Sequence, residues 1–148
     1  MVSVRYKTPS FVTTDDLQSL STEVKKSGET SRLCYHQSVD SAFHMMLICL
    51  PKKEHYPVHR HMDSDETITI LKGELTITIF DSLGKLEEQV LLQPLSDVKK
   101  VTVSILIQRG RWHSVKSGSI DASFLEIKQG PFDKAQMELL SEQNEGMN

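Results

Sequence analysis

The chain has 148 residues, of which 38% are hydrophobic and 25% charged, a composition typical of a folded globular protein. Its formal net charge of -3 gives no electrostatic reason to expect a nucleic acid or an anionic membrane as a partner. No stretch approaches the roughly 18 apolar residues of a membrane span, and the first residues lack the apolar run of a secretory signal. Cys34 and Cys49 lie among apolar or aromatic neighbours, so we expect two buried, reduced thiols in a cytoplasmic protein.

The N-terminal part of the chain predicts one amphipathic helix over residues 13–27. Leu17, Leu20 and Val24 recur at spacings of three and four, which places them on one face of a helix. Threonines at its start can cap it, two aspartates suit the positive end of its dipole, and two lysines suit the other end. Gly28 is a natural stop.

Residues 31–129 predict a region built from β-strands. Short apolar or alternating segments recur roughly every 8–12 residues between turn-forming residues, a pattern typical of a sandwich or barrel. The segment Lys72-Gly73-Glu74 lies between two alternating runs and predicts a hairpin. The expected strands include Ala42–Leu50, Glu66–Leu71, Leu75–Phe80, Leu86–Leu92, Val101–Ile107, Arg111–Val115 and Ala122–Lys128.

A short helix is expected to close the chain. Asp133 can cap it, and it would run over Lys134–Glu142. No internal repeat or linker interrupts the sequence. We therefore expect residues 1–148 to form one all-β domain with its core at 31–129 and a helix at each end.

Several histidines and one glutamate are spaced as if they shared a site. Residues i and i+2 of a strand point to the same face, so His59 and His61 should project together. Glu66 shares its parity with Ile68 and Ile70, the apolar and therefore inward face of the next strand. An inward carboxylate beside two imidazoles is costly unless a cation compensates it. An exposed patch is the commoner explanation of a lone His-x-His pair, but the parity of Glu66 argues against it.

The same residues resemble the first motif of the cupin superfamily. His59-x-His61, four residues, Glu66, six residues and Gly73 match it after its leading glycine, which is absent here. The second motif, Pro-x-Gly-x-x-His, is matched in its glycine and in His113, with the proline replaced. The resemblance implies a single jelly-roll β-barrel in which His59, His61, Glu66 and His113 bind one divalent metal ion.

Longer segments resemble the WbuC family of small bacterial cupin metalloproteins. Some of its members are found with lipopolysaccharide O-antigen biosynthesis, so the resemblance implies a small, sugar-derived substrate. Where members often carry an Arg-Met pair, this chain has Met45-Met46. The similar segments are Arg32–His36, Tyr56–His61, Trp112–Ser114 and Phe124–Phe132.

Three imidazoles and one carboxylate suit Fe, Mn, Ni, Co or Zn, and affinity order alone does not choose among them. On an octahedral ion they would leave two positions for water or a small-molecule ligand. That arrangement permits Lewis-acid catalysis, as in an isomerase or epimerase, or oxygenase chemistry with iron. The alternative is a non-catalytic sensor or binding module that uses the same ion to hold a small ligand.

Four further residues are candidates for the pocket around the ion. Two arginines could bind a carboxylate or phosphate through paired hydrogen bonds. A tyrosine could act as an acid or base, although packing is its simpler role, and a histidine belongs to a segment that resembles the family. These residues are His36, Arg32, Tyr56 and Arg111.

Other polar residues in the chain give weaker indications of a role in the site. His44 is expected to be a hydrogen-bonded core residue, His55 to be solvated, and Arg60 to face outward. Glu126 and Lys128 match family positions, with no role assigned. Sheet edges need covering, and small cupins commonly pair through them, so the resemblance implies a homodimer.

Overall fold

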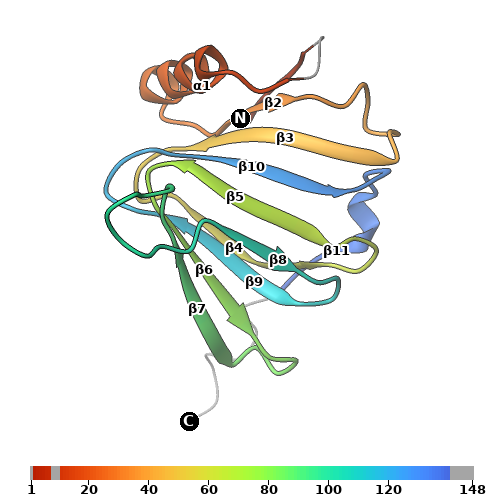
Figure 1. Ribbon diagram of the computed structural model, residues 1–148. Helices are drawn as coiled ribbons and strands as arrows, with labels where there is room; N and C mark the ends of the chain where they lie inside the picture. The colour runs from red at the N-terminus through yellow and green to blue at the C-terminus, as the bar shows by residue number, and fades with distance from the viewer. Residues whose placement is uncertain (1, 8–10, 141–148) are drawn as a thin grey trace.

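The protein consists of two β-sheets and one α-helix in the part of the chain that the structure describes (Figure 1). The structure is a computed structural model, and it describes residues 2–7 and 11–140. A six-stranded sheet has the order β1-β2-β3-β10-β5-β8, and a five-stranded sheet has the order β11-β4-β9-β6-β7. The first contains β1 (Ser3–Tyr6), β2 (Ser31–Cys34), β3 (Phe43–Leu50), β10 (Ala122–Gln129), β5 (Glu66–Lys72) and β8 (Ser104–Ile107). The second contains β11 (Met137–Leu139), β4 (His55–His61), β9 (Trp112–Ser117), β6 (Leu75–Phe80) and β7 (Leu86–Leu92).

The helix α1 (Thr14–Ser27) confirms the prediction for the N-terminal region. Thr13 and Asp16 form a reciprocal capping box, which satisfies backbone donors that the first turn would otherwise leave free. Gly28 ends the helix in the left-handed conformation. Leu20 and Val24 are buried in a small cluster with residues of β2 and β3, so the helix covers the outer face of the larger sheet.

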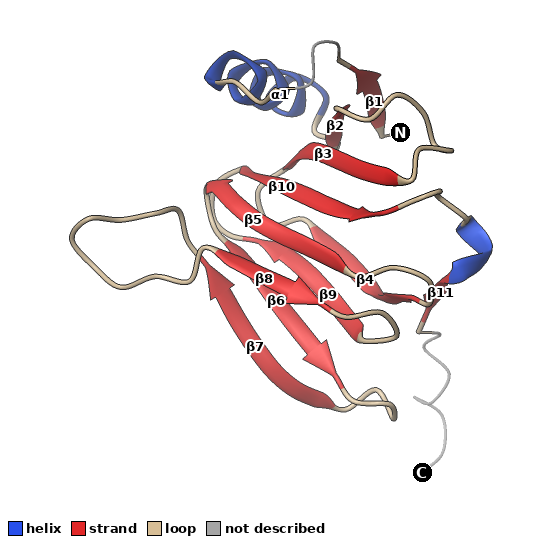
Figure 2. Cartoon of the chain, turned by 45° about the vertical axis from the view of Figure 1, so that its right-hand side comes forward, coloured by secondary structure: helices blue, strands red, loops and turns tan. Residues whose placement is uncertain are grey.

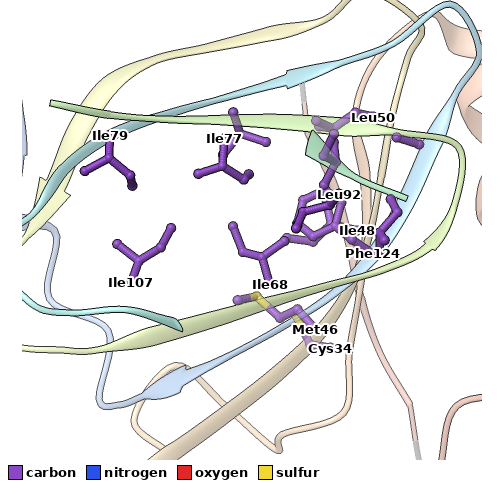
Figure 3. Packing of buried hydrophobic residues seen from close by; sticks show 14 residues of the cluster. Cys34, Met46, Ile48, Leu50, Ile68, Ile77, Ile79, Leu92, Ile107 and Phe124 are labelled. Carbon is purple, nitrogen blue, oxygen red and sulfur yellow. The ribbon is translucent and has the colours of Figure 1, made fainter. Parts of the chain in front are cut away.

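The main core lies between the two sheets. Ile68 of β5 and Ile107 of β8 face Ile77 and Ile79 of β6 across this space (Figure 3). All four side chains are nearly inaccessible to water. Burying an aliphatic side chain of this kind stabilises a fold by about 1.5–3 kcal/mol. The alternating sequences of β5 and β6 therefore place their apolar halves inward, as predicted.

The expected hairpin around Gly73 is wrong, although both of its strands form. β5 pairs with β10 and β8, whereas β6 pairs with β7 and β9, so the turn carries the chain from one sheet to the other. Gly73 has a φ of +74°, and a Cβ atom there would lie 2.5 Å from the backbone oxygen of Asp121. Glycine is therefore needed at this crossing for two reasons, backbone conformation and close approach.

The predicted C-terminal helix is also wrong. Asp133 does cap a turn, but it is a single 3-10 turn over Lys134–Gln136. The chain then extends as β11, which pairs with β4 (Figure 2). Backbone pairing to an open sheet edge replaces the helix here, and residues 141–142 of the prediction lie outside the described part.

Two further features complete the description. Cys34 and Cys49 are free and buried, and they lie in separate apolar clusters, which confirms the expectation of two buried thiols. Among the described residues, no helix is long and apolar enough to cross a membrane.

Candidate metal centre

Four side chains from three strands converge at one point. His59 and His61 come from β4, Glu66 begins β5, and His113 lies in β9. One ligand atom from each residue lies within 4.8 Å of all the others. His59 and His113 are direct partners in the β4–β9 ladder, whereas Glu66 belongs to the opposite sheet. The cluster therefore depends on both sheets being in place.

Two of the imidazoles are oriented by backbone carbonyls. Nδ1 of His59 lies 2.9 Å from the carbonyl oxygen of Pro57, and Nδ1 of His113 lies 3.0 Å from that of Arg111. A carbonyl can only accept, so each Nδ1 carries the proton and donates it. The Nε2 lone pairs are then free to face the cluster, which is the tautomer that metal-binding histidines usually need.

Glu66 supplies the negative charge of the cluster. Its Oε1 lies 2.7 Å from Nε2 of His113, and its Oε2 lies 3.5 Å from Nε2 of His61. Burial favours the neutral acid, but the two histidines outweigh it and hold the pKa of Glu66 below its usual range. Glu66 therefore stays a carboxylate inside the protein.

The histidines respond differently to the same surroundings. Burial lowers the pKa of His59, and it lowers that of His61 to about 4. Burial also opposes the charged form of His113, but the adjacent Glu66 carboxylate raises its pKa. His59 and His61 are thus neutral near pH 7, as metal ligands must be.

The donor set fits a divalent cation. Nε2 of His113 and Oε1 of Glu66 are buried together 2.7 Å apart, and the carboxylate charge is costly there unless a proton or a cation compensates it. Three imidazoles and one carboxylate suit borderline divalent metals. His59, His61, Glu66 and His113 could therefore hold such an ion together.

A cavity of about 380 Å³ opens above the cluster. Small-molecule sites span roughly 300–1,000 Å³, so this one suits a small ligand. Arg32 and Tyr56 line it beside the four cluster residues. Apolar walls complete it, formed by Pro57, Ile68, Val115, Phe124, Phe132, Met137 and Leu139.

Two predicted pocket residues lie elsewhere. The His36 ring stacks on His44 with centroids 4.0 Å apart, and its Nδ1 contacts the backbone of Met45. Arg111 is exposed and forms an ion pair with Glu87 at 2.8 Å. Gly110, with a φ of +78°, forms the turn just before β9, so strand parity does not extend back to Arg111.

The three residues expected outside the pocket behave as predicted. His44 is buried, and its Nε2 lies 3.2 Å from the carbonyl oxygen of Val39. His55 is exposed. Arg60 points away from the cluster, pairs with Glu138 at 2.6 Å and lies over the Trp112 ring.

Glu126 and Lys128 line the cavity and had no predicted role. In β10 they alternate with outward residues and share the inward parity of Phe124. Lys128 is paired in register with Glu66. Strand alternation could have predicted that both residues face the pocket, because the same argument had predicted that Glu66 points inward.

A β-bulge explains how Tyr56 enters the same cavity as His59. The β4–β9 register advances three residues in β4, from Tyr56 to His59, for two in β9, from Val115 to His113. Simple alternation would put Tyr56 and His59 on opposite faces. The extra residue turns Tyr56 inward and leaves His55 exposed, an effect typical of bulges near functional sites.

Fold and site together define a cupin-fold protein with a cluster of three histidines and one glutamate. A model of the family described as Domain of unknown function (DUF6016) matches residues 12–92, and the chain belongs to that family. No curated protein matches the chain.

Solved structures of the same fold are similar at low identity. Oxalate oxidase in complex with glycolate is 20% identical with a TM-score of 0.53, over 66% of this chain and 46% of that one. SO0799 from Shewanella oneidensis is 20% identical with a TM-score of 0.56, over 71% of this chain and 66% of that one. TT1209 from Thermus thermophilus is 21% identical with a TM-score of 0.54, over 70% of this chain and 85% of that one. The chain spans less than half of the oxalate oxidase chain, and these identities support a shared fold alone.

Proposed function

We propose that the protein is a divalent-metal-dependent enzyme that acts on a small molecule, with His59, His61, Glu66 and His113 as the metal ligands. The observation that carries the proposal is the convergence of ligand atoms from these four side chains within 4.8 Å of one another in the lining of a cavity. A bound ion would supply Lewis acidity, or redox chemistry if it is iron. Its identity among Fe, Mn, Ni, Co and Zn is left to experiment.

The protein's own residues have separable tasks in this proposal. The carbonyls of Pro57 and Arg111 hold two imidazoles with Nε2 toward the site. The apolar walls exclude water from one side of a bound molecule, which strengthens polar interactions within the cavity. An isomerase, epimerase or oxygenase reaction is compatible with such a site.

We further propose a WbuC-like cupin metalloprotein that forms one domain over residues 1–148, works in the cytoplasm and uses a sugar-derived substrate. The support is the sequence resemblance of Tyr56–His61 and Phe124–Phe132 to that family, since both segments contribute residues to the cavity. The second candidate is a non-catalytic metal-dependent binding or sensor module. It is favoured by the same cavity, which needs no acid or base to hold a ligand.

The test is metal content together with melting temperature for the wild type, His113→Ala and His55→Ala, all purified without an affinity tag. His113→Ala removes one ligand of four, so we expect sharply reduced metal content and a smaller metal-dependent rise in melting temperature. His55 is an exposed histidine of the same strand as two ligands, and it serves as the matched control.

We expect His55→Ala to bind metal as the wild type does. Full occupancy and full stabilisation in His113→Ala would show that the four-ligand assignment is wrong. A screen of small sugars and acids against the loaded wild type would then separate the enzyme from the binding module, because only the enzyme changes its ligand.

A further inference from the structure

Arg32 has an unusual position for a charged residue. It comes from β2 of the larger sheet and lines the cavity together with residues of the smaller sheet. One terminal nitrogen, Nη2, donates to the hydroxyl oxygen of Tyr56 at 3.2 Å, a bond that connects the two sheets. Tyr56 thereby fixes the orientation of the guanidinium plane.

The remaining donors of Arg32 are not all used. Its Nε atom is buried and has no hydrogen-bond partner among the described residues. A buried donor of a charged group is expensive to leave unpaired. Nε belongs to the fork that grips the two oxygens of a carboxylate in parallel. Because Arg32 lines the cavity, an acceptor on a bound ligand can complete the hydrogen bonding of its guanidinium.

The charges in the cavity also call for an anion. Lys128 Nζ lies 3.9 Å from Glu126 Oε1, so these two largely offset each other. Glu66 offsets one charge of a divalent ion. Arg32 and the remaining charge of the ion then leave a positive excess in a cavity with largely apolar walls.

We infer that Arg32 anchors the carboxylate of a small organic acid whose other oxygen function faces the His59, His61, Glu66 and His113 cluster. This rests on the proposed metal site, because the second oxygen needs the ion as its partner. A 2-hydroxy acid has this chemistry: a planar two-oxygen group for the guanidinium and a hydroxyl beside it. The cavity of about 380 Å³ limits the ligand to a small one.

The experiment measures binding of glycolate and lactate to the Zn-loaded protein by calorimetry and by thermal shift. Inorganic phosphate and propane-1,2-diol are the comparison probes. The variants are Arg32→Met, Arg32→Lys and, as control, Arg109→Met, whose exposed side chain pairs with Asp65 outside the cavity. Metal content and far-UV circular dichroism are recorded for each, so that loss of the ion or of the fold is seen separately.

We expect a hydroxy acid to bind the wild type and Arg109→Met equally, and to bind Arg32→Met at least about tenfold more weakly at unchanged metal content. Arg32→Lys should recover only part of this, because it keeps the charge and loses the fork. If Arg32→Met does not fold, the partial loss of binding in Arg32→Lys still tests the inference.

Three results would overturn the inference. Equal binding of the acids by wild type and Arg32→Met would exclude the guanidinium as anchor. Arg32-dependent binding of phosphate in place of the acids would replace the ligand class. Binding of propane-1,2-diol as tight as that of lactate would exclude recognition of a carboxylate. Failure of the wild type to take up any metal would instead contradict the proposed function, and titration of the metal-free protein would still report on Arg32.

Discussion

His113 and Glu66 form the shortest contact in the cluster, and each residue shifts the pKa of the other. Their nearest atoms are 2.7 Å apart, and both side chains are almost fully buried. Burial disfavours charge on each of them, yet the carboxylate raises the pKa of His113 and the imidazolium lowers that of Glu66. The proton that Glu66 favours on His113 and a bound metal ion would therefore compete for the same nitrogen.

Metal affinity should therefore depend on pH through His113. A metal ligand must be neutral, and His59 and His61 already are at neutral pH because their pKa values are lowered. The pKa of His113 is raised above 6.5, so its proton is present below that raised value and must be displaced. We expect the dissociation constant to rise about tenfold per pH unit below the pKa of His113 and to level off above it. Competition with a chelating dye between about pH 6 and 8 would measure this.

The variant Glu66→Gln tests whether the carboxylate sets the pH dependence of metal binding through the pKa of His113. Without the carboxylate the pKa of His113 should fall, so the pH-dependent range should move downward while overall affinity weakens. His55→Ala should reproduce the wild-type curve, since His55 lies outside the cluster. A dissociation constant that stays flat over this range in the wild type would show that His113 carries no proton to displace.

At the scale of strands, alternation alone was sufficient to predict part of the site. Glu66, Ile68 and Ile70 are buried while the threonines between them are half-exposed. Alternation counted back from His59 would put Tyr56 on the opposite face, but the bulge in β4 changes the parity between the two residues. Nothing in the sequence marks a bulge unambiguously. The resemblance to cupins supplied His113, which is distant in sequence and reaches the cluster only through long-range pairing.

The hairpin predicted around Gly73 is also wrong because long-range strand pairing overrides a local pattern. The Gly73 turn and the alternating strands around it are local features, and both were predictable. The pairing partner of a strand depends on the whole sheet. Here β10 pairs with β5, and β9 pairs with β6. Sequence reasoning that considers neighbours in the chain favours a hairpin of β5 with β6. In the structure, β5 lies between β10 and β8, and β6 lies between β7 and β9.

Gly73 is the residue on which this crossing depends most. Gly73→Ala adds a left-handed alanine and a Cβ atom 2.5 Å from a backbone oxygen, so we expect a loss of about 3 kcal/mol or more in unfolding free energy. Gly28→Ala is the matched control, because its φ of +72° is similar but its Cβ would meet no atom within 4 Å. It should cost only the left-handed conformation of alanine, about 1–2 kcal/mol. Urea unfolding of both variants measures the difference, and equal losses would mean that the close approach to Asp121 is unimportant.

At the scale of the whole molecule, the two sheets formed by residues 2–7 and 11–140 leave four edge strands. β1 and β8 end the larger sheet, and β11 and β7 end the smaller one. Edge strands expose unpaired backbone groups, which proteins usually cover or protect. β1 is exposed along its full length, and Val4 and Tyr6 on one of its faces are about half exposed. Val4 and Tyr6 make one face of this edge apolar, whereas Arg5 lies on the other face and pairs with Glu23 of the helix.

Pairing of two β1 edges offers a physical route to the homodimer that the family resemblance implies, and the dimer stays a prediction. Light scattering should give a mass near twice 16.8 kDa at micromolar concentration. Val4→Lys places a charge on the edge and should shift the mass to that of the monomer, because edge lysines oppose strand addition. Val98→Lys alters an equally apolar residue that is 92% exposed in a loop, and it should leave the dimer intact. A monomeric wild type would contradict the homodimer, and a dimeric Val4→Lys would place its interface on a different edge.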